Sequence, residues 1–156
     1  MRDLAGVAAL VPGAEALDGV LVVEPGKVLA AAEGIKKLGG FILFDLTCVD
    51  RPEGYEVAWR FMDTKERSSE VLTLRAILDR ADPAVPSVMG IWKSADVLER
   101  EVWDLMGISF TGRGRLERIL CTDDFTGHPL RKDFVMPKRS RFPMDEEVRK
   151  GQEGAR

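Results

Sequence analysis

The sequence predicts an α+β domain in which a mixed β-sheet carries helices on one face. Three segments, 41–50, 55–63 and 70–78, alternate apolar and polar residues, which is the pattern of strands with one buried face. Two further segments, 28–38 and 94–106, repeat apolar residues at the spacing of helices. Because each strand has a single apolar face, the helices are expected to form a second layer against that face.

The N-terminal part supplies a short strand and the first of these helices. A brief strand is expected at 20–23, before the helix at 28–38. Lysines in the last turn of this helix suit its dipole, and the Gly-Gly pair at 39–40 ends it. A short additional helix is indicated at 4–11.

The central strands are each expected to turn one apolar face toward the core. The connection at 51–54 is typical of a hairpin between the first two strands. Trp59 and Phe61 are expected to be core residues. The predicted faces are Ile42, Phe44, Leu46 and Cys48 in the first strand, Tyr55, Val57, Trp59 and Phe61 in the second, and Leu72, Leu74, Ala76 and Leu78 in the third.

The helix at 94–106 is charged as well as amphipathic. Ser94 is placed to cap it, and Gly107 is placed to end it in the left-handed conformation. Arg100 and Asp104 lie four residues apart and can form an ion pair, which contributes only about 0.3–0.5 kcal/mol when it is exposed. The charges indicate a solvated helix face, a polar network satisfied within the chain, or a contact with a partner.

The sequence divides into two parts at residue 111. Residues 1–111 form the predicted α+β core domain, which ends with the charged helix. Residues 112–156 contain few core-forming side chains and are expected to be a loop and an extended C-terminal arm. Such a polar segment gains little by folding on itself, so contacts with another protein are expected to offset the cost of ordering it.

Composition and cysteine usage restrict the possible functions. The 156 residues, of which 45% are hydrophobic and 31% charged, are typical of a single globular domain, and the net charge of −3 provides no overall attraction for nucleic acid. No apolar stretch approaches the ~20 residues that cross a bilayer, so any membrane association is expected to go through a partner. Cys48 and Cys121 are not clustered, so no iron–sulfur or zinc site is predicted on this chain.

The only histidine, His128, lies in the stretch 121–134 between an aspartate pair and a basic pair. A catalytic base needs an orienting acid and a nucleophile or substrate; Asp123 or Asp124 could orient His128, but no nucleophile motif accompanies it. One histidine with aspartates is also a weak metal site. No catalytic, cofactor-binding or metal-binding residue is therefore predicted.

Binding interpretations of the same stretch fit better. The basic run 131–141 could neutralise phosphates, but the chain is acidic overall and has no nucleic-acid-binding motif. The Gly-His-Pro turn at 127–129 favours extended chain that presents charged and aromatic residues to a partner protein, although His128 and Asp133 could instead pin a local turn. The predicted partner-binding residues are Glu99, Arg100, Glu101, Asp104, His128, Arg131, Lys132 and Asp133.

Two sequence blocks carry a resemblance to a known family. The first, within 98–110, reads E-R-E-x-x-D-x-x-G-I-x-F, and the second is R-I-L at 118–120 followed by G-H-P-L-R-K-D-F at 127–134. Together they resemble the 30 kDa subunit family, also called the C subunit, of proton-translocating NADH:quinone oxidoreductase (respiratory complex I). The chain departs from that family where Gly-Arg-Gly at 112–114 replaces a common Gly-His-Pro, and where Val-Met at 135–136 delays a proline.

This resemblance implies a non-catalytic scaffold and assembly subunit in the peripheral arm of the complex. The whole complex would transfer electrons from NADH to quinone and translocate protons, and this chain would belong to an enzyme only as its subunit. NADH, FMN, iron–sulfur clusters and quinone would be held by partner subunits, with none on this chain. The partners would be the D and B subunits at the cytoplasmic face of the cell membrane, with no nucleic acid and with membrane contact only through those partners.

Alternative functions stay open at the level of sequence. The chain could be the equivalent subunit of an energy-converting membrane hydrogenase or of a related dehydrogenase complex, which the departures from the family pattern favour. Alternatives of another class are a nucleic-acid-binding domain, whose affinity would depend steeply on salt, and a small hydrolase that depends on His128.

Overall fold

The main sheet of the protein is five-stranded and mixed. The computed structural model describes residues 8–9, 11–65 and 71–136, and it orders the strands β1-β2-β5-β4-β3. β2 pairs with β5 in parallel, and the other pairs are antiparallel. The strands are Glu15–Leu17 (β1), Val20–Val22 (β2), Phe41–Arg51 (β3), Gly54–Asp63 (β4) and Val71–Leu78 (β5).

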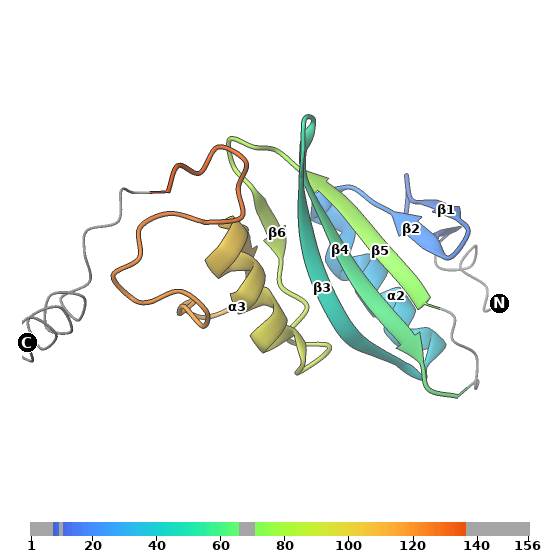
Figure 1. Cartoon of the computed structure of the whole chain (residues 1–156). Coiled ribbons are helices and arrows are strands. Elements are labelled where there is room, and N and C mark those ends of the chain that lie inside the picture. Colours follow the sequence, from blue (N-terminus) through green and yellow to red (C-terminus); the bar gives the residue numbers. More distant parts are fainter. Residues whose placement is uncertain (1–7, 10, 66–70, 137–156) are drawn as a thin grey trace, which may run out of the picture.

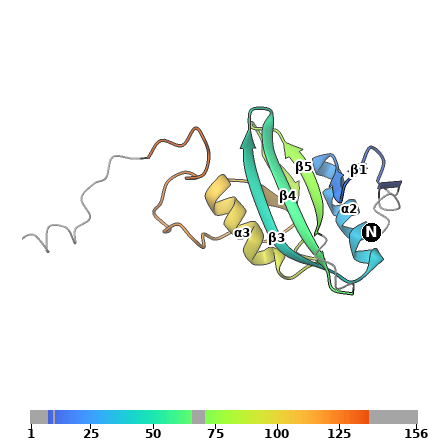
Figure 2. The same cartoon turned by 45° about the vertical axis from the view of Figure 1, so that its right-hand side comes forward.

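Helices and a small strand pair form the second layer. In Figure 1, the helix Val28–Leu38 (α2) lies behind the sheet and the helix Ala95–Met106 (α3) lies beside β3; in the turned view of Figure 2, α2 appears beside β5. The buried residues of this layer and of the sheet make one core cluster, so the predicted α+β class is confirmed. The elements are a 3-10 turn Pro25–Lys27 (η1), the helices Val28–Leu38 (α2) and Ala95–Met106 (α3), and the parallel strands Ala84–Pro86 (β6) and Ser109–Thr111 (β7).

The faces predicted for β4 and β5 are confirmed. Trp59, Phe61 and Leu74 are completely buried, and the other predicted residues of both strands are buried with them. Phe61 packs against Trp92, with ring centroids 4.8 Å apart. This contact packs the segment before α3 against the sheet. Truncating an aromatic side chain in such a core costs about 3–5 kcal/mol of stability.

The face predicted for β3 is wrong in its first half. Leu43 is buried, whereas Ile42 and Phe44, which the alternation predicts to face the core, are 46% and 37% exposed. A β-bulge between Leu43 and Asp45 shifts the register against β4, so the buried face continues at Leu46. Alternation alone cannot locate a bulge, because the extra residue inverts the pattern from that point onward.

The free edge of β3 is covered by the chain that enters α3. Trp92 Nε1 donates to the carbonyl oxygen of Phe41 (3.1 Å), and the Ser94 hydroxyl donates to that of Leu43 (2.8 Å). Ser94 therefore stands at the N-cap position, as predicted, but its side chain bonds to the sheet instead of capping the helix. Gly107 ends α3 in the left-handed conformation (φ 71°, ψ 27°), as predicted.

Two predicted features lie outside the described residues: most of the helix at 4–11, and the part of the C-terminal arm at 137–156. Within the described ranges, no helix has the length and apolar character needed to cross a membrane.

Candidate partner-binding site

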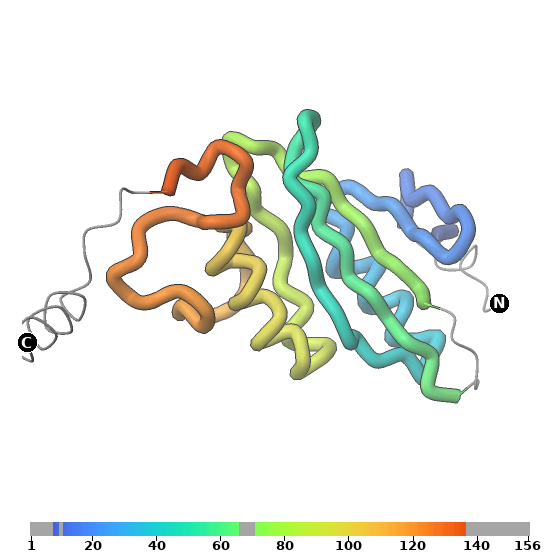
Figure 3. Tube along the Cα trace, viewed as in Figure 1, coloured from blue at the N-terminus to red at the C-terminus, as the bar shows by residue number. Residues whose placement is uncertain are grey.

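The segment 112–136 follows β7 and passes along the side of α3 that faces away from the sheet (Figure 3). Two acidic residues of α3, Glu99 and Asp104, are completely buried beneath it. A buried carboxylate is tolerated only when it is paired and hydrogen-bonded. The partners of these two carboxylates therefore show what holds the segment in place.

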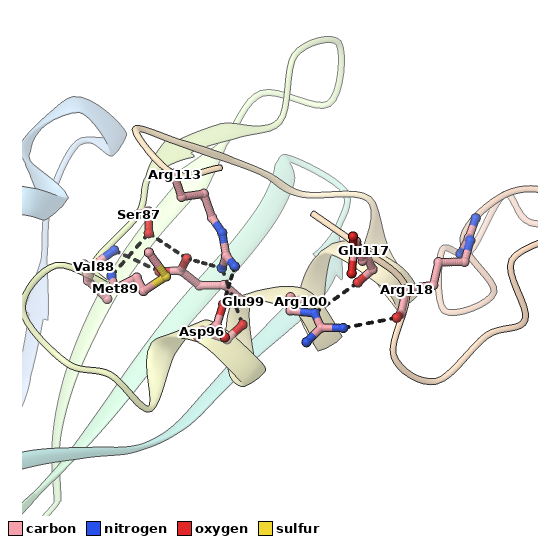
Figure 4. A network of polar contacts seen from close by, with 9 residues as sticks. All are labelled: Ser87, Val88, Met89, Asp96, Glu99, Arg100, Arg113, Glu117 and Arg118. Atoms are coloured by element: carbon pink, nitrogen blue, oxygen red, sulfur yellow. Dashed lines mark hydrogen bonds and ion pairs between the residues drawn. The ribbon is translucent and has the colours of Figure 1, made fainter. Parts of the chain in front are cut away.

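Glu99 joins the start of the segment to the chain before α3 (Figure 4). Its Oε2 accepts from Arg113 Nη1 (2.9 Å) and from the Ser87 hydroxyl (2.7 Å), while Oε1 accepts from the Val88 N–H (2.8 Å). The second guanidinium nitrogen of Arg113 pairs with Asp96. The Arg113 side chain is only 5% exposed, so this is a buried, charge-assisted cluster.

Asp104 binds the middle of the segment with both carboxylate oxygens. Its Oδ2 accepts from three successive backbone N–H groups, those of Ile119 (3.0 Å), Leu120 (2.8 Å) and Cys121 (2.9 Å). Its Oδ1 pairs with the Arg118 guanidinium. Successive N–H groups that converge on one anion form a nest, so the loop is folded around the Asp104 carboxylate.

These contacts determine the ionisation of Asp104. Burial alone would raise the pKa of Asp104, but the N–H groups of Cys121, Ile119 and Leu120 and the guanidinium of Arg118 outweigh it and hold the pKa well below its usual range. Burial, followed by the nearby carboxylate, raises the pKa of the Cys121 thiol. The site is therefore a fixed anion beside a protonated thiol.

We expect the stability of the protein to fall in acid. The pKa of the Asp104 carboxyl is lower in the folded protein than in the unfolded chain, where it is about 3.9. Such a group stabilises the fold at pH values above its unfolded-state pKa, and this contribution is lost as the pH falls from about 5 toward the folded-state pKa. Urea unfolding at pH 7 and at pH 3 measures this loss. The variant Asp104→Asn should lose less stability over the same interval, and an equal loss in both proteins would contradict the assignment.

The end of the segment donates hydrogen bonds to the carbonyl groups at the C-terminus of α3. His128 Nδ1 donates to the carbonyl oxygen of Asp104 (2.9 Å), and Arg131 donates to those of Met106 (2.7 Å) and Gly107 (3.2 Å). The last carbonyl groups of a helix have no partner within it, and a cation there suits the helix dipole. A Cβ at Gly107 would collide with His128 and Arg131, which is a second reason for glycine at this position.

A fourth contact joins the segment to the β3–β4 hairpin. The Lys132 N–H donates to Asp50 Oδ2 (2.9 Å), and Asp50 also pairs with Arg80. The Lys132 N–H and then Arg80 hold the pKa of Asp50 below its ordinary value. The guanidinium groups of Arg80 and Arg131 lie 5.1 Å and 5.0 Å from the centre of the Tyr55 ring, which is cation–π geometry.

The predicted pair between Arg100 and Asp104 is wrong. Arg100 donates to the carbonyl oxygens of Glu117 (3.2 Å) and Arg118 (3.3 Å), as Figure 4 shows. Asp104 pairs instead with Arg118, because its side chain lies in the buried contact between helix and segment. For Glu99 and Asp104, the interpretation as a solvated helix face is therefore excluded.

Five of the eight predicted partner-binding residues hold the segment within the chain: Glu99, Arg100, Asp104, His128 and Arg131. The side chains of Glu101, Lys132 and Asp133 are exposed. Sequence reasoning missed Arg113, Arg118 and Asp50. In both pairs, Glu99 with Arg113 and Asp104 with Arg118, the partners are 14 residues apart, a separation that no helical or strand period reports.

The described part of the predicted arm is thus bonded to the core domain in four places, at Glu99, at Asp104, at the C-terminal carbonyl groups of α3, and at Asp50. Binding of a partner by this segment stays a prediction. Within the described residues, no group of three or more histidine, cysteine, aspartate or glutamate side chains could hold a metal. Burial, and then the Asp50 carboxylate, raises the pKa of Cys48 to about 12, so this thiol is protonated at neutral pH.

Comparison with known proteins agrees with the sequence blocks. The family described as respiratory-chain NADH dehydrogenase, 30 Kd subunit, matches residues 21–140. The chain belongs to this family. The resemblance inferred from the two motif blocks is thereby confirmed.

Relatives of this 30 kDa family member include several components of NADH-quinone oxidoreductase. The C subunit of Moorella thermoacetica is 43% identical over 130 residues, which cover 80% of this chain and 88% of that protein. The C subunit of Geobacter sulfurreducens is 49% identical over 72 residues, which cover 46% of this chain and 44% of that protein. The combined C/D subunit of Pseudomonas fluorescens is 49% identical over 69 residues, but these cover only 11% of that longer protein.

Two solved structures share the fold of this family member. A trypsin-resistant fragment of Nqo5 superposes with a TM-score of 0.62 at 28% identity and covers 74% of this chain and 97% of that chain. A chain of the membrane-bound sulfane sulfur reductase, an archaeal respiratory membrane complex, superposes with a TM-score of 0.72 at 23% identity. The match covers 94% of this chain and 87% of that chain. At that identity the second similarity shows the fold alone.

Proposed function

We propose that this chain is a non-catalytic scaffold subunit in the peripheral arm of a proton-translocating NADH:quinone oxidoreductase. Membership of the 30 kDa family makes it a subunit of a multi-subunit respiratory complex. The observation that best supports a scaffold role is what the buried carboxylates of the chain bind. Glu99 and Asp104 bind a loop of the same chain instead of lining a substrate site.

The geometry at Asp104 is unsuited to acid–base catalysis. A general acid or base must reach the proton that it transfers, directly or through one water. The carboxylate of Asp104 already accepts from three N–H groups and from Arg118, and its side chain is completely buried. These contacts favour a structural role for the carboxylate.

We infer the partners and the location from the same family relationship. Proteins equivalent to the D and B subunits would hold the chain, and they or their neighbours would carry NADH, FMN, the iron–sulfur clusters and quinone. The chain itself would hold none of these cofactors. It would lie at the cytoplasmic face of the cell membrane and contact the membrane only through its partners.

An equivalent role in a membrane hydrogenase or a related dehydrogenase complex is the second candidate. The shared fold of the sulfane sulfur reductase chain is compatible with it. The three bacterial relatives, which are 43–49% identical, are all components of NADH-quinone oxidoreductases, which favours the first candidate.

Purification of the full chain from its native host, by an affinity tag, tests the proposal. We expect companion subunits that include flavin- and NADH-binding proteins, and NADH:quinone reductase activity in the assembled sample. The chain separated from that assembly should show no visible absorbance from flavin or iron–sulfur clusters. Recovery of the chain without companions, or chromophore that stays with the separated chain, would contradict the proposal. Companions with nickel-binding cysteine pairs would identify the hydrogenase-type complex.

A further inference from the structure

We propose that the segment 112–136 presents an apolar and acidic surface to its partner, so the matching surface of the partner subunit is apolar and bordered by lysine or arginine. This inference rests on the proposed function, because it assumes that the segment docks on another subunit. It concerns the chemistry of that contact. The arginines and lysine in this part of the sequence would suggest a basic surface instead of an apolar and acidic one.

Three of the four arginines in the segment are engaged inside the chain. Arg113 pairs with Glu99, and its side chain is 5% exposed. Arg118 pairs with Asp104, donates to the carbonyl oxygen of Gly127 (3.2 Å) and is 14% exposed. Arg131 donates to carbonyl oxygens at the end of α3. These three guanidinium groups are therefore unavailable to bind a carboxylate or phosphate from outside.

The charges that remain exposed on the segment are mainly negative. Four exposed acidic side chains stand against two exposed basic ones. The acidic residues are Glu117, Asp123, Asp124 and Asp133, and the basic residues are Arg115 and Lys132. A surface of this sign repels phosphates and attracts cations, so a nucleic acid or an anionic lipid is the wrong ligand and a cationic protein surface is the right one.

Large apolar side chains project from the same segment. Leu120 and Leu130 are each 59% exposed, Met136 is 70% exposed and Val135 is 84% exposed. The backbone beneath two of them is fixed, because the Leu120 N–H donates to Asp104 and the Leu130 N–H donates to a carbonyl oxygen of α3. Side chains that point outward from a fixed backbone lose little additional conformational entropy when a partner covers them.

The two observations together specify the partner. Exposed apolar side chains and exposed charged side chains are the two components of the usual protein–protein interface, which has an apolar centre and a polar rim. The buried network would then serve to hold the loop in the shape that this interface requires. The occupant is a companion subunit with an apolar patch and a cationic rim.

The double variant Leu120→Asp with Leu130→Asp, made in the tagged full chain, tests the apolar part. We expect the amount of companion subunits recovered per chain to fall by at least about tenfold, with the Tm of the separated chain unchanged. The matched control is Leu17→Asp, since Leu17 is 74% exposed on β1, outside the segment. It should assemble like the wild-type chain.

Charge reversal tests the acidic part. Asp123→Lys with Asp133→Lys should also lower the recovery of companions, whereas improved or unchanged recovery would show that the partner surface is not cationic.

If the wild-type chain assembles and the leucine variant assembles equally well, the inference fails and the proposed function stands. If the wild-type chain itself is recovered without companions, the proposed function fails. A photo-crosslinking residue at position 120 should label an apolar companion peptide that contains lysine or arginine.

Discussion

Replacing Asp104 with asparagine should lower the free energy of unfolding by about 3–5 kcal/mol, the usual cost of removing one partner from a buried ion pair. The amide nitrogen of asparagine is a donor, so it faces either the Arg118 guanidinium or the N–H groups of the loop with the wrong polarity. For a domain of this size, the change corresponds to a fall in Tm of roughly 10 °C. Urea unfolding monitored by tryptophan fluorescence measures it.

The neighbouring glutamate provides the control for this substitution. Glu101 lies on the same helix but is exposed, so Glu101→Gln should change the stability by no more than about 0.5 kcal/mol. The Asp104→Asn protein should also be cut by trypsin within the segment much faster than the Glu101→Gln protein. A loss of less than about 1 kcal/mol for Asp104→Asn would mean that the loop is not held by this carboxylate.

Replacing Arg113 with methionine should cost a similar amount, about 3–5 kcal/mol. Methionine retains the apolar volume of the side chain but leaves Glu99 as a buried anion whose remaining donors are Ser87 and the Val88 N–H. Adding Glu99→Gln should recover part of the loss, because the neutral amide needs no counter-charge and its oxygen can still accept from Val88.

A double-mutant cycle quantifies this pair. The two single variants and the double variant should show a coupling energy of about 1–3 kcal/mol between Arg113 and Glu99. Arg115→Met, at an exposed arginine two residues away, should be nearly neutral. Additive effects of the Arg113 and Glu99 substitutions would contradict the buried pair.

The sequence predicts most of the regular elements, because the information that specifies them is local. Trp59 and Phe61 are buried as the alternation of β4 indicates, and Gly107 ends α3 as its position indicates. The strands β1, β6 and β7 were missed, because each is only three residues long and shows neither periodicity nor the continuous apolar run that indicated β2. The reversal at Leu43 and Phe44 depends on a bulge that alternation cannot reveal.

The candidate site was predicted only in part for a different reason. The sequence identifies Glu99 and Asp104 as unusual charges, but their partners lie 14 residues later, beyond the range of helical spacing. The low apolar content of the segment correctly argues against a hydrophobic core there. The segment is held instead by buried ion pairs and by N–H groups bonded to one carboxylate, which hydrophobicity does not report.

The departure from the family pattern at residues 112–114 has a structural consequence. Arg113, in the Gly-Arg-Gly that replaces the common Gly-His-Pro, supplies the ion-pair partner of Glu99. In this chain the substituted position therefore contributes a cation to the buried network.

Amide hydrogen exchange of Ile119, Leu120 and Cys121 in the isolated chain tests most directly whether the Asp104 carboxylate holds the polar segment on α3. Exchange at these three positions should be slower by at least about 100-fold than in an unstructured peptide, and Asp104→Asn should abolish most of that protection. Exchange at the unstructured rate in the wild-type chain, or equal protection in both proteins, would contradict the account.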